Sequence, residues 1–201
     1  MTEWHFYEPA HGHRLPHDPL NAIVAPRPIG WISTVSAAGV RNIAPYSFFN
    51  VVNYSPPLIA FSSMGWKDTV ANIEVTGEFV WNLATRGLAE AMNATSAAIE
   101  GDEFAAAGIE TLPSRLVKPD RVAASPVSFE CRLTQMLRLE TKEGRALDQW
   151  LVIGEAVGIH IDRAMLDDGV YQTARAMPIM RGGGPADYFE VGELFRMRRP
   201  G

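Results

Sequence analysis

Polar side chains recur inside strand-like sequence between residues 25 and 72, where their types suit ligand binding. Hydroxyl and amide groups stand here among Ile, Val, Phe and Trp, and buried polar groups need hydrogen-bond partners. A flat polar ligand lying on a strand surface would satisfy many of them at once. The donors and acceptors of this segment are Ser33, Thr34, Asn42, Tyr46, Ser47 and Asn50.

A second polar cluster follows, in which Ser62 and Ser63 precede Lys67 and Thr69 at the expected start of a short helix. Hydroxyls, an ammonium group and free backbone N–H groups at the positive end of a helix dipole all attract an anion. The alternative is a polar helix start capped by Asp68 or Thr69, which such residues favour without any ligand. Together the two clusters indicate a pocket for a flat, phosphorylated cofactor.

The elements that position these residues are mostly strands. β-branched and aromatic residues predict strands at 31–36, 40–51, 58–63 and 78–83, and two long strands at 125–140 and 150–161 that pair as a hairpin. Helix is predicted at 68–75, ending at Gly77, and within 88–99 and 102–107. The absence of a strand–helix alternation and of Gly-x-Gly-x-x-Gly after a strand favours an antiparallel barrel over a dinucleotide-binding parallel sheet.

Pro45 interrupts the strand predicted at 40–51, because proline cannot donate to a strand ladder. Such a position is typical of an edge strand or a bulge, where a planar ring can approach the backbone at Ala44 and Pro45. The alternative is an ordinary barrel strand whose polar residues face water.

Length and composition suit one domain, which we expect at residues 19–201 after an irregular arm at 1–18. The net charge of −5 gives no basic surface for nucleic acid. No apolar run approaches the ~18 residues of a membrane span and the N-terminus lacks a signal-peptide core, so we expect a cytoplasmic protein without membrane contact.

Three further features carry little chemistry. Cys131 is the single cysteine and is interpreted as a buried apolar residue. The histidines of the arm lack carboxylate or cysteine partners at a fixed spacing, so no metal site is assigned. His160 ends an apolar strand and is interpreted as structural, hydrogen-bonded through one ring nitrogen.

The ordered motifs of this chain resemble those of the flavin reductase-like, FMN-binding split-barrel family of flavoprotein oxidoreductases. The resemblance extends over about residues 18–200, and its densest matches lie at 25–34, 42–50, 67–72, 76–83, 125–131, 160–161 and 178–183. It implies a mainly β fold: a six-stranded antiparallel Greek-key split barrel with short peripheral helices. It also implies a homodimer with the flavin near the interface.

The resemblance further implies how FMN binds. Its phosphate meets Lys67 and Thr69 with the preceding hydroxyls of Ser62 and Ser63, while the flavin ring lies against the strand at 42–50. Arg27 is expected near the flavin or the dimer contact. Arg181 is expected either to close the cofactor site or to anchor a loop.

The implied activity is that of an FMN-dependent oxidoreductase, with NADH or NADPH as reductant and free flavin, a partner oxygenase or another small molecule as acceptor. No catalytic side chain is expected, because the cofactor carries the chemistry. One departure weakens nicotinamide use: many relatives carry Gly-Asp-His where this chain has Asp148-Gln149-Trp150. The alternatives are a non-catalytic FMN carrier or storage protein and a dimeric scaffold.

Overall fold

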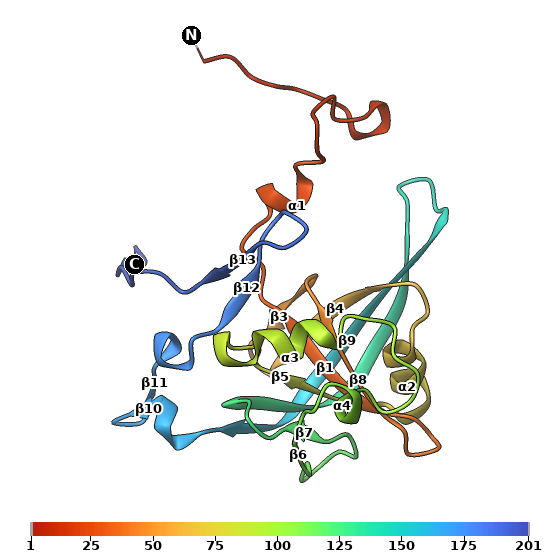
Figure 1. Cartoon of the computed structure of the whole chain (residues 1–201). Helices are drawn as coiled ribbons and strands as arrows, with labels where there is room; N and C mark the ends of the chain where they lie inside the picture. Colours follow the sequence, from red (N-terminus) through yellow and green to blue (C-terminus); the bar gives the residue numbers. More distant parts are fainter. Residues whose placement is uncertain (1, 201) are drawn as a thin grey trace.

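The computed structural model describes residues 2–200 and is mainly β (Figure 1). Its centre is a seven-stranded sheet in the order β2-β1-β5-β8-β9-β4-β3, and the pairings that build it are antiparallel. The strands of this sheet are β1 (Gly30–Val35), β2 (Arg41–Tyr46), β3 (Phe49–Asn53), β4 (Leu58–Met64), β5 (Glu78–Asn82), β8 (Val127–Glu140) and β9 (Ala146–Ile161).

Short elements surround the sheet. Three two-stranded pairs are formed by β6 (Thr111–Leu112) with β7 (Arg121–Val122), β10 (Leu166–Asp167) with β11 (Val170–Tyr171), and β12 (Ile179–Arg181) with β13 (Tyr188–Glu190). The α-helices are α1 (Leu20–Ile23), α2 (Asp68–Thr76), α3 (Ala89–Ala94) and α4 (Glu103–Ala106). The 3-10 turns are η1 (Pro9–His11), η2 (Arg86–Leu88), η3 (Arg163–Met165) and η4 (Thr173–Ala176).

The sheet curls because its two edge strands follow each other in the chain. Strands β2 and β3 lie at opposite ends of the strand order, yet only Ser47 and Phe48 separate them. Neighbouring strands lie about 4.8 Å apart, so a two-residue link cannot cross a flat sheet of this width. The two edges must therefore approach each other, which confirms the predicted split barrel.

The strand count differs from the prediction of six, because the run at 40–51 divides into β2 and β3. The break follows Pro45, which lies on the edge strand β2 as the missing N–H predicts. Beyond the break, the Phe48 carbonyl accepts a hydrogen bond from the Ser62 N–H at 2.9 Å. Strand propensity continues through the residues of this turn, so local sequence does not predict it. The turn is required only because the barrel closes.

The core lies on both faces of strand β1, whose first five residues are buried. Successive strand residues point to opposite faces, so Ile32 joins one cluster inside the barrel and Trp31 joins another beneath the helices. The first cluster includes Phe61 and Phe79, and the second includes Phe104. Helices α3 and α4 therefore complete the fold by covering a sheet face that would otherwise expose tryptophan.

The helices after β5 are shorter than their composition predicts. Helix is predicted over 88–99, but α3 ends at Ala94. The Thr95 hydroxyl donates to the Met92 carbonyl at 2.8 Å and accepts a hydrogen bond from the Trp31 indole N–H at 3.0 Å. This buried tertiary contact holds Thr95 against the barrel. It cannot be predicted from helix propensity, which depends only on local sequence.

Helix α2 and the long hairpin match their predictions closely. Helix α2 ends at Gly77, which adopts a left-handed conformation at φ 70°. Strands β8 and β9 pair over most of their length and project beyond the barrel (Figure 1). In residues 2–18 the only regular element described is η1, and this arm extends away from the barrel (Figure 1). Within residues 2–200, the structure contains no helix long and apolar enough to cross a membrane.

Candidate functional site

A pocket of about 470 Å³ lies where strand β2, the start of α2 and the segment between α3 and α4 meet. We call it the β2–α2 pocket. The segment 95–100 forms one wall, and Asp68 and Glu103 complete the lining. It brings together these members of the predicted site: Asn42, Ala44, Pro45, Tyr46, Lys67 and Thr69.

The start of helix α2 presents unpaired backbone donors at this pocket. Lys67 occupies the N-cap position with an extended backbone, and within residues 2–200 its side chain makes no capping hydrogen bond. The Ala71 N–H bonds the Lys67 carbonyl at 3.0 Å, so the N–H groups of the preceding turn have no partner within the helix. The alternative that Asp68 or Thr69 caps the helix is wrong, because both lie inside its first turn. The positive end of the helix therefore remains available to an anion.

The Tyr46 hydroxyl supplies a second unpaired donor. The residue is 7% exposed, and its hydroxyl has no hydrogen-bond partner among the described residues. Burial raises the pKa of Tyr46, and the nearby Thr69 and Ser63 hydroxyls oppose that shift without forming a hydrogen bond to it. The phenol stays protonated at neutral pH. An unpaired buried hydroxyl costs about 1–3 kcal/mol, and the Tyr46 ring packs against Phe61 in the barrel core.

A polar network connects the pocket wall to the barrel through Asn42. The Asn42 side-chain amide is oriented so that both its nitrogen and its oxygen have hydrogen-bond partners. The nitrogen then donates to Glu103 Oε2 at 3.0 Å, and the oxygen accepts from Thr69 Oγ1 at 2.9 Å. The same oxygen accepts from Thr34 Oγ1 at 3.2 Å, and Thr34 accepts from Asn72 at 3.0 Å. The Thr69 hydroxyl is therefore engaged inside the protein, and its backbone N–H remains at the helix start.

Glu103 is a pocket residue that the sequence prediction missed. It is 7% exposed, and its carboxylate accepts the backbone N–H of Ile43. Burial raises the pKa of Glu103, Asp68 and Asp102 raise it further, and the Ile43 hydrogen bond opposes the shift. The available signal was a glutamate placed directly before Phe104 in an apolar helical stretch.

Three serines that were predicted to bind the cofactor lie outside this pocket and form hydrogen bonds within the protein. Ser33 is fully buried and donates to the Asp120 carbonyl at 2.6 Å. Ser62 accepts from the Gln149 side chain at 2.5 Å, and Ser63 donates to the carbonyl of the glycine two residues on, at 3.2 Å. None of the three lines the β2–α2 pocket. Ser47 is half-buried in the link between β2 and β3.

Arg27 and Arg181 lie away from the β2–α2 pocket, where they join the segment before β1 to the end of strand β12. Their backbones pair through hydrogen bonds of 3.0 and 2.8 Å. The Arg27 guanidinium donates to the Gly182 carbonyl at 2.9 Å, and Arg181 donates to the carbonyls of Pro185 and Asp187 at 2.8 and 2.7 Å. In these contacts Arg181 acts as a loop anchor, the second of its two predicted roles.

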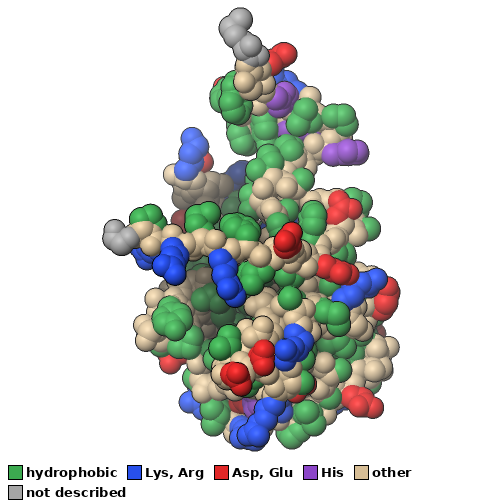
Figure 2. Space-filling view, turned by 90° about the vertical axis from the view of Figure 1, so that its left-hand side faces the viewer, with side chains coloured by type: hydrophobic (Ala, Val, Ile, Leu, Met, Phe, Trp, Pro, Cys, Tyr) green, Lys and Arg blue, Asp and Glu red, His purple; other side chains and the backbone are tan. Residues whose placement is uncertain are grey.

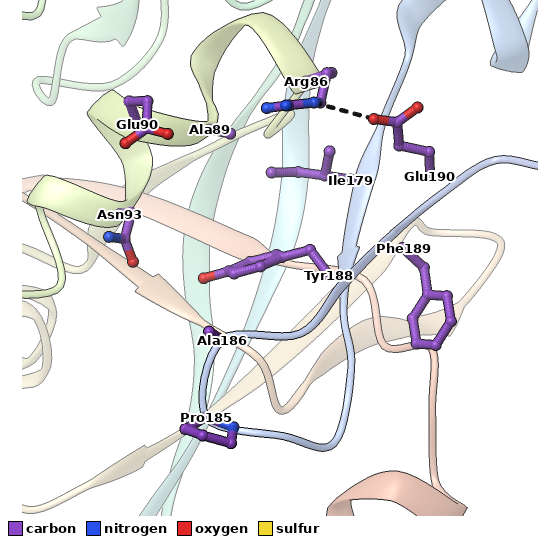
Figure 3. A pocket seen from close by; sticks show the side chains of 10 residues that line it. All are labelled: Arg86, Ala89, Glu90, Asn93, Ile179, Pro185, Ala186, Tyr188, Phe189 and Glu190. Atoms are coloured by element: carbon purple, nitrogen blue, oxygen red, sulfur yellow. Dashed lines mark ion pairs between the residues drawn. The ribbon is translucent and has the colours of Figure 1, made fainter.

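A second pocket, of about 570 Å³, lies between α3 and the β12–β13 hairpin (Figure 3). Arg86 pairs with Glu190 at 3.0 Å, and both side chains are about 60% exposed. The Tyr188 hydroxyl points toward Asn93 across the pocket (Figure 3). The predicted site residues are not among those lining this pocket. Its charged groups sit on the solvent side, where an ion pair contributes little.

A third hollow, of about 480 Å³, is almost entirely apolar and lies on the sheet face near β3, β5, β8 and β9. Phe49 and Trp81 stack there with ring centroids 5.5 Å apart. Asn50, which was predicted to bind the cofactor, lines this hollow instead of the β2–α2 pocket. Figure 2 shows hydrophobic side chains spread over the face that it presents, and exposed apolar residues include Val51, Val52 and Ile159.

Comparison with known proteins gives consistent matches over most of the chain. Residues 24–180 match the family described as flavin reductase like domain. An uncharacterized protein from Aquifex aeolicus is 39% identical over 172 residues, covering 81% of this chain and 83% of that protein. YwrF from Bacillus subtilis, also uncharacterized, is 32% identical over 189 residues, covering 90% and 91%.

Solved structures agree. Nitrilotriacetate monooxygenase component B from Bacillus cereus superposes with a TM-score of 0.82 at 30% identity, covering 89% of this chain and 90% of that one. The 2-nitrobenzoate 2-nitroreductase NbaA from Pseudomonas fluorescens superposes with a TM-score of 0.80 at 28% identity, covering 90% and 88%. Sequence and fold together show that this chain belongs to the flavin reductase-like split-barrel family.

Proposed function

We propose that this protein is a cytoplasmic, homodimeric flavoprotein oxidoreductase that binds FMN in the β2–α2 pocket. NADH or NADPH serves as reductant, and a small molecule or a partner oxygenase accepts the electrons. Two similar solved structures support this reading, one a component of a monooxygenase and the other a nitroreductase.

The observation that carries the proposal is an uncapped helix start beside a lysine in one pocket. The uncapped start of α2 and the exposed Lys67 ammonium suit a phosphate group. A flavin ring would lie against Ala44 and Pro45, which line the same pocket. These residues fit FMN by donor chemistry and by position on one wall. When bound, FMN would supply the hydride and electron transfer.

The protein's own contribution is binding and orientation. Burial raises the pKa of Tyr46, so its phenol stays protonated and does not act as a base. Pro45 leaves part of the β2 edge without an N–H, which lets a planar group approach the strand. Lys67 and the first turn of α2 would hold the phosphate of FMN, while the β2 edge would hold its ring. No nucleophilic side chain is required by this arrangement.

The apolar hollow on the sheet supports the homodimer. Phe49, Trp81 and Phe129 line a hollow with few polar groups, beside the exposed Val51 and Val52 of the edge strand β3. A contiguous apolar surface of this kind is typical of a protein–protein interface. A second copy of the chain would cover it, and light scattering coupled to size exclusion tests this with a dimer mass as the expected result.

Anaerobic stopped-flow spectroscopy of the FMN-loaded protein tests the function. We expect NADH or NADPH to bleach the flavin absorbance faster than it bleaches free FMN. Bound FMN that reacts no faster than free FMN would indicate a carrier instead. A folded protein that leaves added FMN unbound would overturn the cofactor assignment.

A further inference from the structure

Glu103 places a buried carboxylate in the same pocket as the proposed phosphate site. It extends from helix α4 and is 7% exposed. Two donors face it from β2: the Ile43 backbone N–H and the Asn42 amide nitrogen, the latter at 3.0 Å from Oε2. These contacts fix the carboxylate beside Thr69 at the start of α2, because Asn42 also bonds the Thr69 hydroxyl.

The charged groups around Glu103 are mostly acidic. From α2, Asp68 faces it, and from its own element Asp102 does. The loop before α4 adds Glu100 to the pocket lining. The cation of the pocket is Lys67, which is exposed at the start of α2.

The basic residue on β2 forms its ion pairs with other carboxylates and not with Glu103. Arg41 pairs with Asp102 at 2.5 Å and with Asp120 at 3.6 Å. The ion pairs of the described residues include none to Glu103. Its negative charge is therefore compensated by hydrogen bonds alone.

A bound phosphate monoester adds a charge of about −1.5 to −2 to this pocket. An ionised carboxylate in the same low-dielectric region would repel it, and like charges at a shared site drive one group to bind a proton. Protonation of Glu103 removes this repulsion and adds an O–H donor. Burial and the neighbouring acids already favour the protonated form, since they raise the pKa of Glu103.

We infer that Glu103 takes up a proton from solvent when the phosphate of FMN enters the pocket, and so couples pH to the affinity for phosphorylated flavin. The inference rests on the proposed FMN site. Between the pKa of Glu103 in the free protein and its higher pKa in the complex, binding consumes one proton. The Kd for FMN then rises by up to about tenfold for each unit of increasing pH. Riboflavin, which lacks the phosphate, requires no such uptake.

The experiment measures Kd for FMN and riboflavin by flavin fluorescence between about pH 5.5 and 8.5, a range that also covers the phosphate ionisation near pH 6. Wild type is compared with Glu103→Gln, which keeps a carbonyl oxygen for the Ile43 N–H. Glu90→Gln is the matched control, because it removes an exposed carboxylate that lies outside the β2–α2 pocket. The phosphate of free FMN titrates identically in all samples, so its ionisation in solution cancels in ratios between variants.

We expect the ratio of the wild-type Kd to the Glu103→Gln Kd for FMN to rise with pH, up to about tenfold per unit. For riboflavin the same ratio should stay flat, and Glu90→Gln should follow wild type. Parallel FMN profiles for wild type and Glu103→Gln would overturn the inference and leave the proposed function standing. Failure of wild type to bind FMN at any pH would overturn both.

A measurement on wild type alone covers the case in which Glu103→Gln does not fold. Calorimetric titrations in two buffers of different ionisation enthalpy count the protons taken from solvent on binding, and we make them at several pH values between about 5.5 and 8.5. Uptake with FMN should exceed uptake with riboflavin between the pKa of Glu103 in the free protein and its higher pKa in the complex. Equal values for the two ligands at every pH would overturn the inference.

Discussion

Replacing Lys67 by alanine removes the one ammonium group of the proposed phosphate site. Lys67 is exposed at the N-cap position, and α2 keeps its first intrahelical hydrogen bond because that bond uses the Lys67 backbone carbonyl. A hydrogen bond to a charged group contributes about 1.5–3 kcal/mol, and solvent screening at an exposed position reduces it to about 1–2 kcal/mol. The Kd for FMN should therefore rise by about 5- to 30-fold. Thr69 is left unchanged, because its hydroxyl is bonded to Asn42 and its loss would disturb the fold.

Fluorescence titration with FMN and riboflavin at two salt concentrations measures this effect. Riboflavin affinity should hardly change, and the FMN deficit should shrink at high salt because exposed charges are screened. Lys142→Ala is the matched control: this lysine is 91% exposed at the tip of the β8–β9 hairpin. An equal loss for both flavins, or an equal loss in the control, would refute the phosphate assignment.

Two further predictions concern the barrel. Glu130 is fully buried and accepts hydrogen bonds from His160 and three backbone N–H groups, so Glu130→Ala should lower the free energy of unfolding by about 3–5 kcal/mol at neutral pH. Burial raises the pKa of Glu130, but the hydrogen bonds outweigh burial and the net pKa is lowered. The stabilisation is therefore lost as pH falls through the pKa of Glu130 in the folded protein. Urea unfolding at several pH values should show that the stability deficit of the variant shrinks in acid. A Cβ on Gly154 would lie 2.4 Å from the Phe79 ring, so Gly154→Ala should cost about 1–3 kcal/mol or more in the same assay, whereas Gly87→Ala, with no atom within 4 Å, should not.

Much of the fold could be predicted from local sequence, because strand propensity, turn residues and helix stops are each encoded in short runs of residues. The turn at Lys142, the helix stop at Gly77 and the buried Cys131 were all predicted from single residues or short runs, and the structure confirms them. His160, interpreted as structural, bonds Glu130 through one ring nitrogen, as predicted.

The break between β2 and β3 could not be predicted in this way. Strand propensity runs through Ser47 and Phe48, and only the meeting of two sheet edges requires a turn there. The order of elements predicted an antiparallel barrel and the resemblance a split barrel, but strand propensity predicted one long strand at 40–51.

In the candidate site too, some residues could be predicted from local sequence and others depend on tertiary packing. Lys67 and Tyr46 were predicted because a charge and a hydroxyl in apolar sequence are local signals, and both line the β2–α2 pocket. Glu103 was missed because its burial depends on α4 docking against the Ile43 backbone, which no sequence period records. Ser33 was predicted as a ligand contact because a buried hydroxyl needs a partner, and that partner proved to be the Asp120 carbonyl.

The central claim is that FMN binds with its phosphate at the start of α2, and amide NMR tests it most directly. Titration of isotope-labelled protein with FMN should shift the backbone amides of Asp68, Thr69 and Val70 far more than titration with riboflavin does. The amides of β2 should respond to both flavins. Absence of any shift at saturating FMN, or shifts at α2 that are the same for both ligands, would contradict the account.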